Sequence, residues 1–108
     1  MKIVDAQIHI WSSGSPSGLH RKVLSFTAEE ALREMDEAGV DAALIHPPGS
    51  WDPSSNTLAV EAARKYPDRF AVMGQFPPNQ PENRKLIHGW KNQPGMMGLR
   101  WALLSPAE

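Results

Sequence analysis

Clusters of glycine and proline divide this sequence into short segments that alternate between strand and helix character, and this alternation constrains the fold most. The clusters and single prolines lie at residues 14–18, 47–53, 67, 77–81, 94–98 and 106. The strand-like segments between them are residues 3–11, 40–46, 69–76 and 97–104. Strands that are separated by helices in this way are typical of a parallel sheet with right-handed crossovers.

The segment after Thr27 has the clearest helix signals. Thr27 and Glu30 form a capping box, and apolar residues then recur at helical spacing as far as residue 38. Gly39 supplies a C-terminal stop. Residues 56–66 predict a second helix, and residues 81–90 predict a third from a weaker apolar pattern. The predicted order is therefore β-α-β-α-β-α-β.

The length of the chain limits the number of strand-helix units. A (β/α)8 barrel of roughly 250 residues uses about 31 residues per unit, so a chain of this size holds about three and a half units. The last residues, 105–108, have the pattern of a helix start. We therefore expect residues 1–108 to be a single unit, an incomplete TIM-barrel domain that continues past Glu108.

Charge and hydropathy exclude several classes of protein. The 11 Lys and Arg and 12 Asp and Glu give a formal charge of −1, so the chain lacks the basic patch of a nucleic-acid-binding protein. The apolar runs are far shorter than the roughly 20 residues that cross a membrane. Asp5, Gln7 and His9 interrupt the apolar stretch that a signal peptide would need. We expect a cytoplasmic protein with neither nucleic acid nor membrane as a partner.

The first strand-like segment alternates apolar and polar residues. Its two predicted faces are Val4, Ala6, Ile8 and Ile10 on one side, and Asp5, Gln7, His9 and Trp11 on the other. Strands of a parallel sheet are covered on both faces, so a polar row there needs a ligand, a metal or hydrogen-bonding partners. An edge strand with its polar side in water is the alternative. His9 and Trp11 lie at the C-terminal end of the segment, where α/β sheets and barrels bind ligands.

Three further candidate residues lie in or just after the later strand-like segments. His46 ends the second strand-like segment, and Trp51 lies in the loop after it, so both are candidates for a pocket mouth. Arg100 lies in the fourth segment, where its guanidinium could hold a substrate carboxylate through two hydrogen bonds. A hydrogen-bonded strand end for His46 and an ion pair at the rim for Arg100 are the alternatives.

Several segments together resemble the amidohydrolase-related (amidohydrolase 2) TIM-barrel family of metal-dependent hydrolases, lactonases and decarboxylases. These segments are VDAQIHIW at 4–11, TAEE at 27–30, GVDAA at 39–43, YPDRF at 66–70 and GLR at 98–100. Their order and spacing cover nearly the whole chain. The resemblance implies the first four strands of a (β/α)8 barrel. It also implies a hydrolase in which water attacks the carbonyl of a small lactone, ester or carboxylated substrate.

One position of the first strand-like segment differs from the family pattern and affects the expected metal binding. The first strand of the family usually reads Asp-x-His-x-His, and both histidines bind a divalent metal, commonly zinc. Here Gln7 replaces the first histidine and His9 matches the second. An amide oxygen is a poorer zinc ligand than imidazole, so we expect weak or absent zinc binding. A metal-free, lactonase-like site in which Gln7 orients substrate or water fits this expectation. The alternative is a zinc site held partly by His9.

The implied site combines these residues around a small-molecule substrate. His9 and Gln7 would act in catalysis, while Arg100, Trp11, His46 and Trp51 would bind the substrate. The remaining ligands of the family lie on later strands, beyond Glu108. The alternative is a non-catalytic α/β module, a half-barrel or flavodoxin-like sheet whose two open edges pair with another copy in a homo-oligomer.

Overall fold

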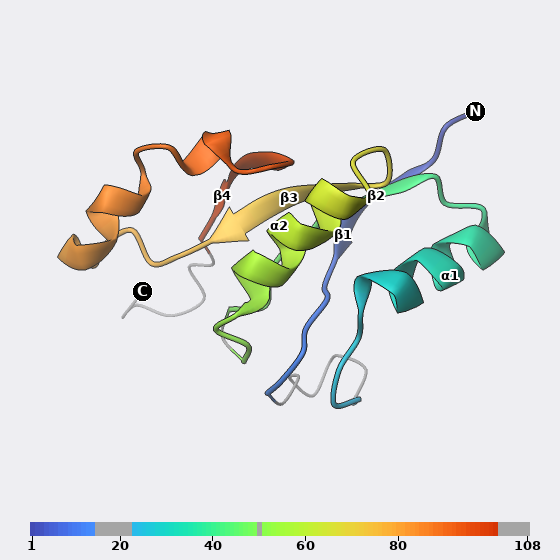
Figure 1. Ribbon diagram of the computed structural model, residues 1–108, viewed down its shortest axis with the longest axis horizontal. Coiled ribbons are helices and arrows are strands. Elements are labelled where there is room, and N and C mark those ends of the chain that lie inside the picture. The colour runs from blue at the N-terminus through green and yellow to red at the C-terminus, as the bar shows by residue number, and fades with distance from the viewer. Residues whose placement is uncertain (15–22, 50, 102–108) are drawn as a thin grey trace.

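The computed structural model describes residues 1–14, 23–49 and 51–101. Their elements, in chain order, are β1 (Val4–Ile8), α1 (Ala28–Ala38), β2 (Ala42–Ile45), α2 (Ser55–Lys65), β3 (Phe70–Gln75), the 3-10 helices η1 (Pro81–Leu86) and η2 (Trp90–Asn92), and β4 (Met96–Arg100) (Figure 1). The strands form one parallel sheet in the order β1-β2-β3-β4. The predicted parallel strand-helix alternation is therefore confirmed. The expected end of the fourth strand and the helix start at 105–108 lie outside the described residues.

Helix α1 begins and ends where its capping residues predict. The Thr27 hydroxyl accepts a hydrogen bond from the Glu30 backbone N–H at 3.1 Å. Gly39 follows the helix with φ of 76°, a left-handed conformation that glycine adopts without strain. These local interactions fix both ends of the helix independently of the sheet.

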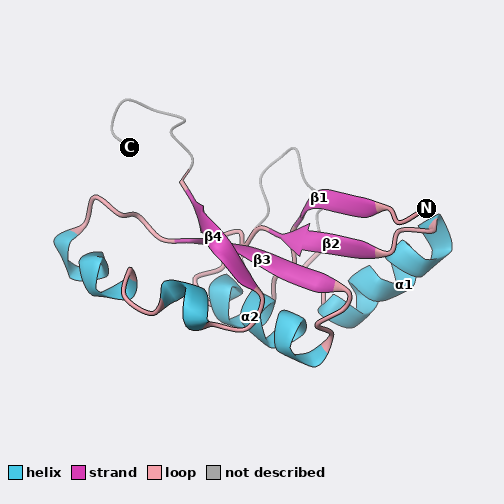
Figure 2. Cartoon of the chain, turned by 90° about the horizontal axis from the view of Figure 1, so that it is seen from above, coloured by secondary structure: helices cyan, strands magenta, loops and turns pink. Residues whose placement is uncertain are grey.

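Helices α1 and α2 both lie on one face of the sheet (Figure 2). The core between them and the strands is made of apolar residues, with small side chains on α2. Its buried members are Ile10, Ala31, Met35, Ala43, Ile45, Ala59, Ala62, Ala63, Phe70, Val72 and Met96. The other face carries apolar side chains that no described helix covers, among them Ala42, Leu44 and Met73, so that face is open. Among the described residues, no helix is long and apolar enough to span a membrane.

The predicted third helix over residues 81–90 is wrong: the segment forms η1 and η2 instead of one α-helix. Leu86 and Ile87 are exposed, so this segment has no continuous apolar stripe to bury. Trp90 anchors η2 to the sheet, because its indole N–H donates to the Gly98 carbonyl at 2.9 Å and its ring packs against Phe76.

A bulge in β1 changes which residues share a face. Asp5 pairs with Ala43 and Ile8 pairs with Ile45, so three residues of β1 span the same interval as two residues of β2. Ala43 and Ile45 are buried against the helices, which places Asp5 on the helix side together with Ile8. The Asp5 carboxylate accepts a hydrogen bond from the Gln7 backbone N–H at 3.0 Å, within the bulge. The predicted polar row of Asp5, Gln7 and His9 is therefore wrong for Asp5.

Candidate active site

Each strand of the sheet has a polar side chain at its C-terminal end. These residues are His9 after β1, His46 after β2, Gln75 at the end of β3 and Arg100 at the end of β4. The strands are parallel, so all of these ends lie at one edge of the sheet, where barrel enzymes place their active sites. Gln75 pairs with Arg100 in the sheet register, which places the two residues side by side.

Sequence reasoning missed Gln75. The available signal was a polar residue at the end of an apolar segment, immediately before Phe76 and Pro77. Asn56 of α2 holds this strand end in place: its side chain accepts from the Gln75 N–H at 2.9 Å and donates to the Gln75 carbonyl. The main chain at Gln75 is therefore fixed.

His9 and His46 are joined by hydrogen bonds across β1 and β2. The His9 Nδ1 donates to the His46 backbone carbonyl at 2.6 Å, because a carbonyl oxygen can only accept. The neutral His9 ring therefore carries its lone pair on Nε2. In the other direction, the His46 Nε2 donates to the Ala6 carbonyl at 3.1 Å and the His46 N–H donates to the Ile8 carbonyl at 2.8 Å. Both rings are held in defined orientations.

The surroundings of His46 favour its neutral form. Burial lowers the pKa of His46, the hydrogen bond to the Ala6 carbonyl raises it in part, and the positive charge of Arg100 lowers it further. The net pKa is below the usual value. The buried Nδ1 of His46 has no hydrogen-bond partner among the described residues. At neutral pH this nitrogen is therefore an acceptor that faces no donor within the described chain.

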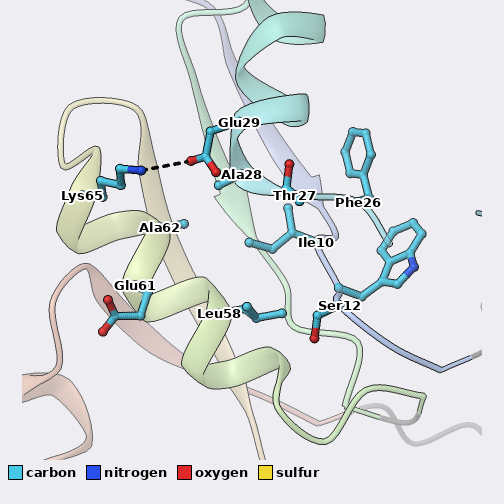
Figure 3. Close-up of a pocket in the computed structure, with 11 residues that line it drawn as sticks. Ile10, Ser12, Phe26, Thr27, Ala28, Glu29, Leu58, Glu61, Ala62 and Lys65 are labelled. Atoms are coloured by element: carbon cyan, nitrogen blue, oxygen red, sulfur yellow. Dashed lines mark ion pairs between the residues drawn. The ribbon is translucent and has the colours of Figure 1, made fainter. Parts of the chain in front are cut away.

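The two tryptophans of the predicted site lie in different environments. The Trp51 ring meets His9 edge to face, with 5.8 Å between the ring centroids. Trp11 is 5% exposed, and its indole N–H donates to the Val23 carbonyl at 3.1 Å. Its ring packs beside Phe26 and lines a groove on the helix side of the sheet. This groove lies between α1 and α2 (Figure 3). The structure thus places the Trp51 ring against both His9 and Trp11, whereas the other contacts of Trp11 are packing contacts on the helix side of the sheet.

Gln7 and Arg100 occupy opposite margins of the sheet. The Gln7 side chain is exposed on β1, at one edge of the strand order. Arg100 lies on β4 at the other edge, and its charge reaches His46. The candidate site is therefore a broad open surface across the sheet edge.

A buried carboxylate, that of Asp52, lies beside this surface. Sequence reasoning did not identify it as a candidate site residue either. It is 0% exposed and accepts hydrogen bonds from Ser12, Ser13 and Ser54. Burial alone would raise the pKa of Asp52, but the hydrogen bonds from Ser54 and Ser12 outweigh it and lower the pKa to about 2. Asp52 is therefore ionised at neutral pH.

A metal ion binds only where several ligand side chains lie close together. Within the described parts of the chain, no three His, Cys, Asp or Glu side chains form a group that could hold an ion. His9 would supply a single ligand, and Gln7 stands at the neighbouring position of the same face. These residues do not form a complete metal site by themselves.

Comparison with known proteins identifies the fold. No protein-family profile and no curated protein match the sequence. A crystal structure of a probable 2-pyrone-4,6-dicarboxylic acid hydrolase from Acinetobacter baumannii, with citric acid bound, is similar, with a TM-score of 0.68 and 20% sequence identity. The match covers 98% of this chain and 42% of that TIM-barrel chain. The chain therefore has the fold of part of a (β/α)8 barrel and spans less than half the length of the hydrolase it resembles.

Proposed function

We propose that this chain is the N-terminal part of a cytoplasmic amidohydrolase-related hydrolase that cleaves a small lactone or ester bearing a carboxylate. The observation that carries the proposal is the alignment of His9, His46 and Arg100 along one edge of a parallel sheet, at the C-terminal ends of its strands. The similarity of the fold to a hydrolase supports it. The resemblance of the segments around His9 and Arg100 to the amidohydrolase-related family supports it independently.

The proposed reaction is attack of water on the substrate carbonyl. The water oxygen bonds to the carbonyl carbon, the C–O bond of the lactone or ester breaks, and the leaving oxygen takes up the proton that the water loses. His9 in its protonated form would polarise the carbonyl, because its Nε2 then carries a proton that it can donate to the carbonyl oxygen. Gln7 would orient the substrate or water, and the hydrogen bond from His9 would stabilise the developing oxyanion. The family resemblance places the water-activating aspartate on the eighth strand of the barrel, beyond the four described here.

Arg100 is proposed to bind the substrate carboxylate. Its guanidinium can make two parallel hydrogen bonds to such a group. The similar hydrolase is named for a dicarboxylic acid, which supports the same chemical class for this protein. His46 and Trp51 would line the space between Arg100 and His9.

Kinetics of the complete gene product that contains this chain would test the proposal. We expect ring opening of carboxylated pyrones or related lactones, followed by ultraviolet absorbance. Arg100→Ala should raise the KM by about 10- to 100-fold, because losing a hydrogen bond to a charged group costs about 1.5–3 kcal/mol. Arg33→Ala, on the exposed side of α1, is the matched control. An Arg100→Ala enzyme with the KM of the Arg33→Ala enzyme would refute the role of Arg100.

The same preparation would decide the metal question. We propose weak or absent zinc binding, because the amide of Gln7 replaces an imidazole nitrogen. Metal analysis should then find less than one zinc per chain, and turnover should survive a chelator. Stoichiometric zinc together with chelator-sensitive turnover would contradict this proposal.

A second candidate is a non-catalytic half-barrel that associates with another copy of itself. The open apolar face and the unpaired outer edges of β1 and β4 in the described sheet favour it. This candidate predicts self-association in sedimentation velocity and no turnover of any lactone or ester. Turnover by the gene product that depends on Arg100 would exclude it.

A further inference from the structure

Asp52 connects the loop after β1 to the loop before α2. Its Oδ2 accepts from the Ser12 N–H at 2.8 Å and from the Ser12 hydroxyl at 3.3 Å. Its Oδ1 accepts from the Ser13 hydroxyl at 3.3 Å and from the N–H and hydroxyl of Ser54 at 2.9 and 2.6 Å. Both carboxylate oxygens are therefore used, and donors come from both loops.

The main chain of the two loops is also in direct contact. Gly14 has φ of 89°, and a Cβ built on it would lie 1.7 Å from the Trp51 carbonyl oxygen. Only glycine fits this position, because of both its conformation and the close approach. On the other side, the N–H groups of Trp51 and Asp52 donate to the Pro48 carbonyl at 3.1 and 2.9 Å. The backbone of Trp51 is thus held by hydrogen bonds within its own loop on one side and by the close approach of Gly14 from the loop after β1 on the other.

The Trp51 side chain links these two loops to the candidate site, because its ring contacts His9. Its ring meets His9 at 5.8 Å with 75° between the ring planes, and it meets Trp11 at 5.9 Å with 85° between the planes. Edge-to-face contacts of this kind depend on ring orientation. A displacement of the Trp51 main chain would therefore change the contact with His9.

We infer that Asp52 is a positioning residue that holds the Trp51 ring against His9 by clamping the loops after β1 and β2. In this inference Asp52 acts on His9 through Trp51, its neighbour in the chain. The inference rests on the proposed function only where it treats His9 as a reacting group. The clamp itself can be measured without any reaction.

The competing explanation is that Asp52 contributes to global stability alone. A buried carboxylate with satisfied oxygens stabilises the loops whether or not Trp51 communicates with His9. The two explanations differ in whether Asp52 and Trp51 act on His9 independently. A double-mutant cycle measures this coupling.

The test uses the complete gene product, with Asp52→Asn and Trp51→Ala made singly and together. Either orientation of an asparagine side chain turns its NH2 group toward N–H or O–H donors of Ser12 or Ser54, so the clamp should open. The readout is the position of the His9 ring signals in long-range 1H–15N NMR spectra. We expect each single substitution to shift these signals, and the double mutant to show no larger shift than Trp51→Ala alone.

Two controls separate positioning from stability. Asp36→Asn removes an exposed carboxylate on α1 that pairs with Arg69, and should leave the His9 signals unchanged. Phe70→Leu trims a buried core side chain at the start of β3, at the opposite end of the strands from His9, and supplies a variant with a lowered Tm. It should lower the Tm without the His9 shift seen in Asp52→Asn.

The inference is wrong if Asp52→Asn lowers the Tm but leaves the His9 signals in place, or if its shift adds to that of Trp51→Ala. Should Asp52→Asn fail to fold, Ser13→Ala removes one donor at 3.3 Å and keeps the carboxylate. Ser13→Ala should shift the His9 signals in the same direction by a smaller amount, and no shift would overturn the inference. NMR coupling without turnover would contradict the proposed function and leave the clamp standing.

Discussion

At the scale of single residues, burial acts on Asp52 and His46 alike, but their hydrogen-bond partners leave Asp52 charged and His46 favoured in its neutral form. Burial disfavours the charged form of either group. The donors of Ser12 and Ser54 around Asp52 outweigh this cost, so its carboxyl stays ionised. At His46, the single bond to a backbone carbonyl does not outweigh burial, so its pKa falls. The loop after β2 therefore carries a fixed negative charge at Asp52, while His46 at the end of that strand is favoured in its neutral form.

The low pKa of Asp52 makes stability depend on pH in the acid range. The folded carboxyl has a pKa of about 2 against 3.8 for the unfolded group, so the unfolded chain takes up this proton at a higher pH. The resulting stabilisation of about 2 kcal/mol is present above about pH 4 and is lost as the pH falls toward 2. Urea unfolding between pH 2 and 5 should show the advantage of wild type over Asp52→Asn shrinking by about that amount. A difference independent of pH would contradict the assigned pKa.

At the scale of elements, glycines decide how closely a tryptophan and a helix approach the sheet. A Cβ on Gly74 of β3 would lie 2.5 Å from Cζ2 of Trp90 and 2.9 Å from Cε of Met96. A Cβ on Gly95 would lie 2.5 Å from that of Ala63 on α2. Small residues at these positions let η2 and α2 pack directly on the sheet at β3 and at the start of β4.

Gly74→Ala should therefore destabilise the protein. The added methyl group overpacks a region already filled by Trp90, at a typical cost of about 1–3 kcal/mol. Gly49→Ala is the matched control, because its Cβ would make only an ordinary contact of 3.6 Å with the Gln75 side chain. Urea denaturation of both variants measures the difference. Equal stabilities for the two variants would show that the Trp90 contact is not tight in solution.

At the scale of the whole molecule, the two faces of the sheet differ in how they are covered. The helix face is buried, whereas Val4 and Met97 are 57% and 58% exposed. In a closed (β/α)8 barrel the face opposite the helices is the packed interior. The four strands match 42% of such a barrel, so their open face corresponds to a part of a barrel core.

We expect the 108 residues alone to show no hydrolytic activity. The described residues supply His9, His46 and Arg100, but the water-activating group of the proposed mechanism is not among them. Purified chain should give no turnover of a lactone or an activated ester, with the complete gene product as positive control and circular dichroism to verify folding. Turnover by this chain that His9→Ala abolishes would contradict the expectation.

Local signals in the sequence were sufficient for the four strands, the first two helices and their order, but not for residues 81–90, which form η1 and η2. The cap at Thr27, the stop at Gly39 and the alternation of strand and helix all depend on residues within a few positions of one another. The parallel sheet follows from that alternation, and it places the strand ends that carry His9, His46 and Arg100 at one edge. This much of the fold and of the candidate site could be predicted from the sequence.

Tertiary structure decided the remaining features, because they depend on partners distant in the chain. Ser12 and Asp52 are 40 residues apart, and no local pattern marks the carboxylate that joins them. The bulge that turns Asp5 toward the helices becomes visible only in the register with β2. The hydrogen bond from Trp11 to the Val23 carbonyl, which holds the Trp11 ring in the packed region, joins residues that the sequence pattern does not pair. The pairing of Gln75 with Arg100, which places Gln75 at the candidate site, also depends on the sheet register. The periodicity of a segment predicts which of its residues share a face, whereas the tertiary structure determines which other residues that face contacts.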